Sequence, residues 1–393
     1  MKIILIGCGC GEQSLTAEAA EAIRQADILV GSRRLMDLFG GGKHCIEAVR
    51  PEEIASALKS SWCETACALF SGDSGFYSGA SRLLPLLEGE DVSVLPGISS
   101  LQMFSAKLQI PWQGWHFCSA HGRKCDPVKE VCRGKPVFFL TGGSVTPAEL
   151  CRELCAAGLG ELPVAVGENL GGHNERICRG VANDYVNQTC APLSVMLAEK
   201  APNRKQYLPG IPDTCFARAE GIPMTKREVR AVALSLLNVK EDSVCWDIGT
   251  GTGSVAIELA LHAGAVYGIE QNEDAVSLAE ENRRALGAWN LHLIRGHAPE
   301  ALDSLPEADA VFVGGTGGNG REILRTVLEK SPKASICVTA VTLETLHMAS
   351  VLLEEEGYET EILQLSASRS KVVGRSHMMT AQNPIWLISG KRP

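Results

Sequence analysis

The sequence lacks the features that mark membrane, secreted and nucleic-acid-binding proteins. It has no run of about 18 apolar residues, so we expect no membrane span. The N-terminus holds one lysine, a short apolar strand and then glycines, which is too short and too turn-rich for a signal peptide. No long basic block occurs and the net charge is -9, which argues against nucleic acid as a partner. These absences together predict a cytoplasmic protein.

Cysteine is abundant, but the sequence lacks any C-x-x-C motif. The 15 cysteines are scattered singly, and an odd number in a chain of this size without a signal peptide argues against a secreted disulfide framework. The nearest pairs, Cys8 with Cys10 and Cys63 with Cys67, lack partner ligands at the spacing of a metal site. We therefore expect reduced thiols and no metal site.

Short apolar runs alternate with amphipathic ones along the whole chain. This alternation predicts parallel α/β sheets, and the length predicts about two to three domains. The expected strands are Lys2–Ile6, Asp27–Val30, Ala66–Phe70, Val92–Leu95, Val137–Leu140, Pro163–Val166, Val244–Asp247, Ala265–Ile269, Leu291–Arg295, Ala310–Val313 and Ala334–Thr339. The expected helices include Leu15–Arg24, Ser254–His262 and Asp274–Leu286.

A proline-rich break separates the chain into two halves. Residues Glu199–Pro223 hold four prolines and no sustained periodicity, which is typical of an interdomain linker. We predict domains at residues 1–200 and 223–393 with a linker at 201–222. The segment MTKREVRAVALSLLNV then predicts an amphipathic helix before the strand at Val244. No internal repeat occurs, and the halves place their glycine loops differently, which indicates two unrelated folds in fusion.

The second half carries a glycine loop directly after an expected strand. The loop Asp247-Ile-Gly-Thr-Gly-Thr-Gly253 has the spacing G-x-G-x-G, with an acidic residue two positions before the first glycine. Glycines let the backbone turn tightly and approach a ligand closely. NAD-binding loops instead read G-x-G-x-x-G. The loop resembles the S-adenosylmethionine loop of class I methyltransferases, which have a Rossmann-like fold. The resemblance implies that the following loop residues bind this cofactor: Gly249, Thr250, Gly251, Thr252 and Gly253.

Further motifs of the second half occur in the order of this fold. Glu270 ends the next expected strand, where a carboxylate can accept both ribose hydroxyls. Gly296–Ala298 would lie beside the adenine, and Asp309–Gly318 ends the fourth strand, where the substrate meets the methyl group. Together with MTKREVRA, which contains Thr225, and SRSKVVGRSHMMTAQNPIWLISG, these motifs resemble the decarboxylating carbon-15 methyltransferases of cobalamin biosynthesis over nearly all of Gly221–Gly390.

One position of the second half departs from that family. His297 stands where family sequences usually have Asp, which could hydrogen-bond the adenine amino group. A backbone amide could take over that contact. The resemblance implies that Thr225, Glu270 and Ala298 bind the cofactor together with the glycine loop.

The first half resembles a different family, the tetrapyrrole methylases, which bind S-adenosylmethionine between two α/β subdomains. Four motifs over Lys2 to about Ala198 carry the resemblance: IGCGCGEQSLTAEAAEAI, SGDSGFYSGA, LPGISSLQ, and SAHGR with the later PVAVGENLGGHNERI. Together they resemble the carbon-5 methyltransferases of the same pathway. The resemblance implies cofactor binding by Gly9, Cys10, Ser71, Gly72, Asp73, Phe76, Ser99 and Ser100.

Two positions of the first half depart from the family pattern. Cys10 and Ser74 replace prolines that family members usually carry in these loops. Proline fixes φ, so we expect both loops to be looser than in the family. The glycines that permit the turns remain, and no catalytic group is lost.

The two resemblances together imply one enzyme with two methyl-donor sites. Each glycine loop would serve one methylation, at carbon 5 or at carbon 15 of a tetrapyrrole, and the acetate on carbon 12 would lose carbon dioxide. The families also imply a homo-oligomer. The sequence leaves open whether the macrocycle carries cobalt and which methylation comes first.

Methyl transfer requires alignment of the attacking carbon, the methyl group and the sulfur, and exclusion of water. It depends less on a set of catalytic side chains. His121 and His377 are candidates for proton transfer. Arg123 and the basic cluster Arg369, Lys371 and Arg375 suit the substrate carboxylates, although a solvated loop explains the cluster equally well.

Further residues have two readings each. Arg227 and Arg230 could join the substrate contacts or be surface charges of an amphipathic helix. Met378 and Met379 could form an apolar patch for the leaving carboxylate, although we expect at least one of them in the core.

Two alternatives remain. A fused methyltransferase acting on RNA or a small metabolite is disfavoured by the acidic charge and by the tetrapyrrole-type loops. A chain with one inactive half, acting as a single-site enzyme or scaffold, is suggested by the departures at Cys10, Ser74 and His297. The affinity of each half for the methyl donor distinguishes this alternative.

Overall fold

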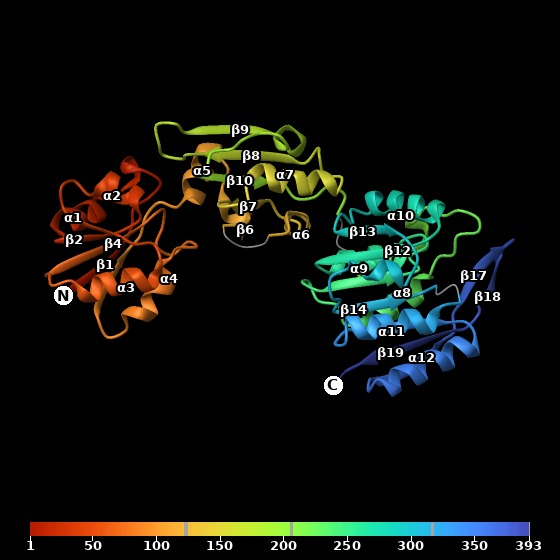
Figure 1. Ribbon diagram of the computed structural model, residues 1–393. Coiled ribbons are helices and arrows are strands. Elements are labelled where there is room, and N and C mark those ends of the chain that lie inside the picture. Colours follow the sequence, from red (N-terminus) through yellow and green to blue (C-terminus); the bar gives the residue numbers. More distant parts are fainter. Residues whose placement is uncertain (122–124, 205–206, 316–317, 393) are drawn as a thin grey trace. The chain divides into compact units, whose positions relative to one another are not determined.

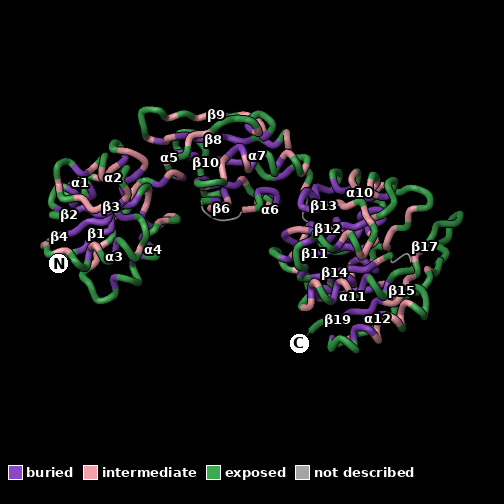
Figure 2. The backbone as a smooth tube through the Cα atoms, viewed as in Figure 1, coloured by how far each residue is buried: buried purple, intermediate pink, exposed green. Residues whose placement is uncertain are grey.

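The computed structural model describes residues 1–121, 125–204, 207–315 and 318–392. The chain forms two compact units, which are described separately (Figure 1). The N-terminal unit comprises Met1–Val131 and Lys135–Lys200, and the C-terminal unit comprises Cys132–Gly134 and Ala201–Pro393. Buried residues follow the strands of each unit, shown in purple in Figure 2. Each unit therefore has its own hydrophobic core.

The N-terminal unit begins with a fully parallel five-stranded sheet in the order β3-β2-β4-β1-β5. Its strands are β1 (Lys2–Gly7), β2 (Ile28–Gly31), β3 (His44–Glu47), β4 (Thr65–Phe70) and β5 (Asp91–Leu95). Its helices are α1 (Ala17–Gln25), α2 (Arg33–Phe39), α3 (Pro51–Ser60) and α4 (Ala80–Leu83). Ile4 and Ile6 pack with α1 and α2, whereas Ile3 and Leu5 pack with α3 and α4. Because both faces of the sheet are covered, its inner strands β1, β2 and β4 are almost continuously apolar, and the predicted parallel sheet is confirmed.

The second sheet of the N-terminal unit has the order β6-β7-β10-β8-β9. Its strands are β6 (His116–Ser119), β7 (Val137–Leu140), β8 (Pro163–Glu168), β9 (Arg176–Val181) and β10 (Ser194–Ala198). Its helices are α5 (Ser100–Leu108), α6 (Pro127–Val131) and α7 (Pro147–Ala156). Only β6 and β7 pair in parallel, so the prediction of parallel sheets is wrong here. The connections from β8 to β9 and onward contain no α-helix, and short connections of this kind join antiparallel neighbours.

The C-terminal unit is built on a seven-stranded sheet in the order β13-β12-β11-β14-β15-β19-β16. Its strands are β11 (Val244–Ile248), β12 (Ala265–Glu270), β13 (Leu291–Arg295), β14 (Ala310–Val313), β15 (Ser335–Ala340), β16 (Glu359–Leu365) and β19 (Ile385–Lys391). The strands from β13 to β15 are parallel, as predicted, and β19 and β16 add antiparallel partners that the sequence did not predict.

Helices cover both faces of this sheet, which gives the Rossmann-like architecture. They are α8 (Arg227–Leu237), α9 (Ser254–His262), α10 (Glu273–Ala285), α11 (Gly320–Lys330) and α12 (Leu343–Glu355). Residues of α8 and α9 form one core cluster with the sheet, and residues of α11 and α12 form the other. The glycine loop follows β11 at the centre of the sheet, where the strand order reverses. Ligands of open α/β sheets bind at such a point.

The stretch 201–222, for which we expected a linker, packs into the C-terminal unit. Ile211 and Phe216 are almost fully buried in the core cluster of α8 and α9. The Nε1 atom of Trp289 donates to the carbonyl of Pro202 at 2.8 Å. This stretch therefore contributes to the C-terminal core in addition to connecting the halves.

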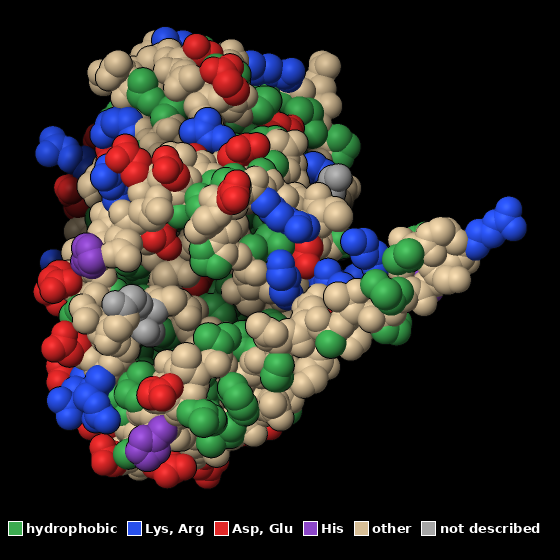
Figure 3. Space-filling model, turned by 90° about the vertical axis from the view of Figure 1, so that its right-hand side faces the viewer, with side chains coloured by type: hydrophobic (Ala, Val, Ile, Leu, Met, Phe, Trp, Pro, Cys, Tyr) green, Lys and Arg blue, Asp and Glu red, His purple; other side chains and the backbone are tan. Residues whose placement is uncertain are grey.

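A two-stranded hairpin, β17 (Ser368–Val373) with β18 (Ser376–Ala381), extends from the C-terminal unit (Figure 3). Met378 and Met379 on β18 are 53% and 62% exposed, so the expectation of a core role for one of them is wrong. The reason is that, among the described strands, β17 and β18 pair only with each other, and nearly all of their residues are exposed. Among the described residues, no helix has the length and apolar character needed to cross a membrane.

Candidate active sites

The N-terminal site is built where three parallel strands end. Gly7 at the end of β1, Gly72 after β4 and Gly97 after β5 contact one another through their backbones. A Cβ on Gly97 would lie 2.3 Å from the Gly72 carbonyl oxygen and 2.4 Å from that of Gly7. No side chain fits at these contacts, so glycine lets the loops converge. Gly9 adds a pair of backbone hydrogen bonds with Gly72, of 3.0 and 2.8 Å.

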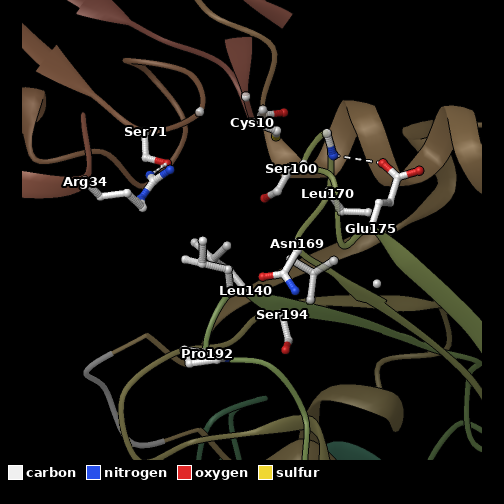
Figure 4. Close-up of a pocket in the computed structure, with 18 of the residues that line it drawn as sticks. Cys10, Arg34, Ser71, Ser100, Leu140, Asn169, Leu170, Glu175, Pro192 and Ser194 are labelled. Atoms are coloured by element: carbon white, nitrogen blue, oxygen red, sulfur yellow. Dashed lines mark hydrogen bonds between the residues drawn. The ribbon is translucent and has the colours of Figure 1, made fainter. Parts of the chain in front are cut away.

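A cavity of about 790 Å³ opens beside these loops and reaches the second sheet of the unit (Figure 4). Its volume lies in the range of cavities that bind cofactors. Most of the residues predicted for this site line it: Cys10, Ser71, Gly72, Asp73, Phe76, Ser99, Ser100 and His121. Gly9 is outside the lining but pairs with Gly72, which is part of it. Arg123 lies outside the described residues.

The two loops that lack the family prolines are held by hydrogen bonds. The backbone N–H of Cys10 donates to Ser14 Oγ at 2.8 Å, and the Cys10 thiol lies 3.5 Å from the Ile98 carbonyl oxygen. The Ser74 hydroxyl donates to the Leu95 carbonyl at 3.2 Å. Burial raises the pKa of the Cys10 thiol to about 11, so it is a neutral thiol at pH 7.

Asp73 organises the loops around the cavity. Its Oδ1 accepts from the N–H of Gly75 at 2.9 Å and its Oδ2 accepts from the N–H of Gly97 at 3.1 Å. The carboxylate therefore joins the loop after β4 to the loop after β5. Ser99 caps α5, because its hydroxyl accepts from the N–H of Gln102 at 3.2 Å. Ser100 then begins that helix at the cavity.

Several polar residues of the cavity were not predicted individually. Arg34 donates from Nη2 to Ser71 Oγ at 2.8 Å, and Figure 4 shows its guanidinium directed toward Ser71. Lys107 pairs with Glu175 at 2.6 Å, and Glu175 also accepts from the N–H of Gly171 at 2.8 Å. The Lys107 hydrogen bond is the main reason that the pKa of Glu175 is lowered.

Sequence signals for these residues exist. Glu175 belongs to the stretch PVAVGENLGGHNERI, which carries part of the resemblance, and Arg34 follows shortly after β2, at the edge where parallel strands place their sites. His121 reaches the cavity from the segment after β6, with Nδ1 3.5 Å from the Thr141 carbonyl oxygen.

The C-terminal glycine loop has the backbone shape that its sequence requires. Gly249, Gly251 and Gly253 all have positive φ, of 77°, 55° and 80°. A Cβ on Gly249 would lie 2.5 Å from the Gly315 carbonyl oxygen. A Cβ on Gly251 would lie 2.9 Å from the Pro223 carbonyl oxygen, so the backbone at Pro223 borders the loop. Thr250 donates from Oγ1 to the Asp247 carbonyl at 2.9 Å and fixes the turn.

Glu270 connects the glycine loop with the end of β12. Its Oε2 accepts from the N–H of Gly251 at 2.9 Å, and its Oε1 accepts from the N–H of Asn272 at 2.9 Å. Both contacts leave carboxylate lone pairs available, since each oxygen can accept more than one hydrogen bond. The geometry is compatible with two ribose hydroxyls as further donors.

Two buried polar atoms of this loop region have no partner among the described residues. They are Asp247 Oδ1 and Thr252 Oγ1. Burial raises the pKa of Asp247 to about 7, although its Oδ2 accepts from the N–H of Ala256 at 2.9 Å. Buried polar atoms without a partner, beside a loop whose backbone requires glycine, fit a polar ligand at this edge of the sheet.

The remaining predicted residues of the C-terminal site lie on segments around the loop. Thr225 lies two residues before α8, and its carbonyl accepts from Arg230 Nη1 at 2.5 Å. Ala298 packs against the core cluster of α11 and α12. The neighbouring carbonyl of His297 accepts from the N–H of Ala301 at 2.7 Å.

The cationic residues of the second half differ in their surroundings. Arg230 is fully buried between Asp213 and Glu258, so the alternative of a surface charge is wrong for this residue. Arg369 on β17 is paired with Asp213 and Glu228. Lys371 and His377 are exposed on the hairpin strands, and Arg375 is exposed in the turn between them. No cluster of three or more metal-binding side chains occurs among the described residues.

Comparison with known proteins agrees with this division. Residues 2–185 match the family of Tetrapyrrole (Corrin/Porphyrin) Methylases, and residues 215–391 match the Precorrin methyltransferase domain. The chain is 44% identical over 185 residues to a probable cobalt-precorrin-6B C(15)-methyltransferase (decarboxylating) of Pyrobaculum calidifontis, covering 46% of this chain and 95% of the relative. It is 28% identical over 389 residues to a precorrin-6Y C(5,15)-methyltransferase [decarboxylating] of a Sinorhizobium species, covering 95% of this chain and 92% of the relative. The chain belongs to the precorrin-6Y C(5,15)-methyltransferase family.

Among solved structures, a precorrin-6Y C5,15-methyltransferase of Geobacter metallireducens is 36% identical, with a TM-score of 0.45. The alignment covers 47% of this chain and 98% of that one. As a member of the precorrin-6Y C(5,15)-methyltransferase family, the chain is an S-adenosylmethionine-dependent methyltransferase. The two glycine-loop regions described above are therefore its candidate active sites.

Proposed function

We propose that this chain methylates carbons 5 and 15 of a precorrin-6-type macrocycle and removes carbon dioxide from the acetate on carbon 12. One methyl donor would bind in each unit. The observation that carries the proposal is the presence of two unlike glycine loops, each at the carboxyl edge of a parallel sheet. The Sinorhizobium relative, which spans 95% of this chain, supports the assignment of both activities to one polypeptide.

In the N-terminal unit the residues that would hold S-adenosylmethionine come from the three converging loops. They are Gly9, Cys10, Ser71, Gly72, Asp73, Phe76, Ser99 and Ser100. When bound, this group supplies an electrophilic methyl attached to a sulfonium. The neutral Cys10 thiol suits such a site, because a thiolate would compete as a nucleophile. The carboxylate of Asp73 would act by fixing two loops.

The same cavity offers groups for an anionic, largely apolar macrocycle. Phe76 and Tyr77 line it, with ring centroids 4.9 Å apart, and provide an apolar contact surface. Arg34 supplies positive charge at its wall for a carboxylate arm, whereas the charge of Lys107 is paired with Glu175. His121 would take part in moving the proton that carbon 5 or its neighbour must lose after methylation. Arg123 remains a proposed carboxylate contact from the same segment.

In the C-terminal unit Glu270 would accept the ribose hydroxyls, and Thr225, Ala298 and the loop 249–253 would surround the donor. Lys371, Arg375 and His377 of the hairpin would approach the carboxylates of the macrocycle, since they are exposed. Met378 and Met379 are exposed beside them and could form the apolar surroundings that favour loss of carbon dioxide.

The deciding experiment is the product mass after incubation of the full chain with S-adenosylmethionine and either the metal-free or the cobalt-bound macrocycle. Gain of two methyl groups with loss of one carbon dioxide is expected from one of the two forms. One methyl with decarboxylation would mean that the N-terminal site is inactive. No mass change with either form would contradict the proposal.

A further inference from the structure

Arg369 anchors the base of the hairpin to the body of the C-terminal unit. Its Nε and Nη2 atoms contact Glu228 Oε1 and Oε2 at 3.2 and 2.6 Å, which is a bidentate pair. Its Nη1 contacts Asp213 Oδ2 at 3.0 Å. Every nitrogen of this guanidinium therefore faces a carboxylate of the same chain. These contacts use three of its five N–H donors, and the two adjacent carboxylates disfavour the approach of a substrate carboxylate.

Asp213 is shared between two arginines. Its Oδ2 pairs with Arg369, whereas its Oδ1 accepts from Arg230 Nη1 at 3.0 Å and from the N–H of Arg227 at 3.0 Å. The side chain of Asp213 is 5% exposed and that of Arg230 is 0% exposed. Burial alone would raise the pKa of Asp213, but hydrogen bonds from Arg230 and Arg369 hold it below its ordinary value. The carboxylate is thus charged and joins the hairpin to the buried network.

The buried network ends at the segment that borders the glycine loop. Arg230 donates from Nη1 to the Thr225 carbonyl at 2.5 Å and from Nε to Glu258 Oε1 at 2.6 Å. Glu258 belongs to α9, the helix that starts from the glycine loop. Two residues before Thr225, the carbonyl of Pro223 lies against Gly251. The network therefore connects Arg369 with both sides of the proposed donor site.

We infer that Arg369 is a positioning residue for the methyl-donor site of the C-terminal unit. Through Asp213 and Arg230 it holds the segment from Pro223 to Thr225 against the glycine loop, and in doing so it sets the affinity for the donor. The inference rests on the proposed function of that loop. It replaces the sequence-based hypothesis that Arg369 binds a carboxylate of the macrocycle.

The two roles of Arg369 differ in what happens when no macrocycle is present. A positioning residue affects binding of the donor product S-adenosylhomocysteine to the free protein. A residue that only binds substrate carboxylates leaves this affinity unchanged and raises KM for the macrocycle. Calorimetric titration of S-adenosylhomocysteine into the full chain therefore separates the roles. The C-terminal site is identified as the one whose affinity is weakened in Glu270→Gln.

The variants are Arg369→Ala, Arg369→Lys and, as a matched control, Arg284→Ala, which removes an exposed arginine from a surface ion pair of the same unit. We expect Arg369→Ala to weaken the C-terminal site about 2- to 30-fold, the range typical of residues coupled to a site through one network. Arg369→Lys should lie between wild type and Ala, because an ammonium keeps the charge but cannot form the bidentate pair. Arg284→Ala should bind as wild type does.

Unchanged affinity in a folded Arg369→Ala protein would overturn the inference, as would an equal loss in Arg284→Ala. Folding is checked by thermal melting, and equal melting temperatures exclude a general loss of structure. If Arg369→Ala does not fold, Glu228→Gln tests the same contact, because Glu228 is the partly exposed partner of Arg369. Unchanged affinity in Glu228→Gln then overturns the inference. The proposed function itself fails if the wild-type chain binds S-adenosylhomocysteine at fewer than two sites. It also fails if Glu270→Gln weakens the affinity of neither site.

Discussion

The carboxylate of Glu270 accepts a hydrogen bond from the backbone N–H of Gly251 at 2.9 Å, and through it the end of β12 holds the glycine loop after β11. A second N–H, from Asn272, points at the other oxygen of the same carboxylate. The residue proposed to bind ribose is thus also the residue that fixes the loop. We therefore expect substitution of Glu270 to weaken donor binding more than it lowers the stability of the fold.

We predict that Glu270→Gln weakens S-adenosylhomocysteine binding at the C-terminal site by about tenfold or more. An amide has one accepting oxygen, so its NH₂ group would face one of the two backbone N–H donors. Calorimetry on the full chain measures the effect. Glu273→Gln, which alters an exposed carboxylate three residues further on, is the control and should bind as wild type does. Equal affinities in both variants would contradict the assignment of Glu270.

A second prediction concerns the close backbone contacts among Gly7, Gly72 and Gly97 in the N-terminal unit. Gly97→Ala should abolish methylation at carbon 5, because its Cβ would lie 2.3 Å from the Gly72 carbonyl oxygen and would push the loops apart. Gly114→Ala is the matched control, since nothing lies within 4 Å of its Cβ. Neither glycine has positive φ, so the comparison isolates close contact from backbone strain. Carbon-5 methylation that persists in Gly97→Ala would show that the loops tolerate separation.

Arg34 gives a third prediction, on substrate binding. Arg34→Ala should raise KM for the macrocycle in carbon-5 methylation by about 10- to 150-fold and leave carbon-15 methylation unchanged, because it removes a charge-assisted contact worth about 1.5 to 3 kcal/mol in one site only. Arg33→Ala is the control, because Arg33 is exposed on the same helix and does not line the cavity. The prediction is wrong if both variants raise KM equally, since the effect would then be one of general charge.

Arg230 gives a fourth prediction, on stability. Arg230→Met should lower the free energy of unfolding of the C-terminal unit by about 3 to 5 kcal/mol, because it leaves Asp213 and Glu258 buried without their counter-charge. Arg284→Met, which removes a 62% exposed member of a surface pair, should cost less than about 1 kcal/mol. Hydrogen exchange of residues 207–260 in urea measures both. Similar losses in the two variants would mean that the buried pairs contribute no more than surface pairs.

The glycine loops can be predicted from the sequence because they require glycine at closely spaced positions. Gly249 and Gly251 adopt positive φ, which glycine tolerates best, and the G-x-G-x-G spacing displays this need within a few adjacent residues. The central parallel strands are predicted for a similar reason, since both their faces are buried and their residues are continuously apolar. The hairpin β17–β18 has no comparable apolar pattern in its sequence, because its residues are exposed on both faces.

The buried arginine and the polar wall of the cavity could not be predicted from local pattern. Arg230 sits on an amphipathic helix beside other charges, and only the fold of residues 210–216 over α8 makes its position internal. Arg34 and Glu175 are separated by more than one hundred residues and meet only across the cavity. Long-range packing, which a single sequence does not record, decides which charged residues are functional.

Asp247 gives the last prediction, on pH dependence. Burial raises its pKa to about 7 from the ordinary value of 3.8, so the folded unit holds this proton at pH values where the unfolded chain has released it. The stability due to the protonated carboxyl is therefore fully present below about pH 3.8 and is lost as the pH rises to about 7, by an amount on the order of 4 kcal/mol. Asp247→Asn, which has no proton to lose, should unfold at about the same urea concentration as wild type at pH 4. At pH 8 it should be the more stable protein, by hydrogen exchange of the C-terminal unit. Parallel pH profiles for the two proteins would show that the buried carboxyl does not titrate in this range.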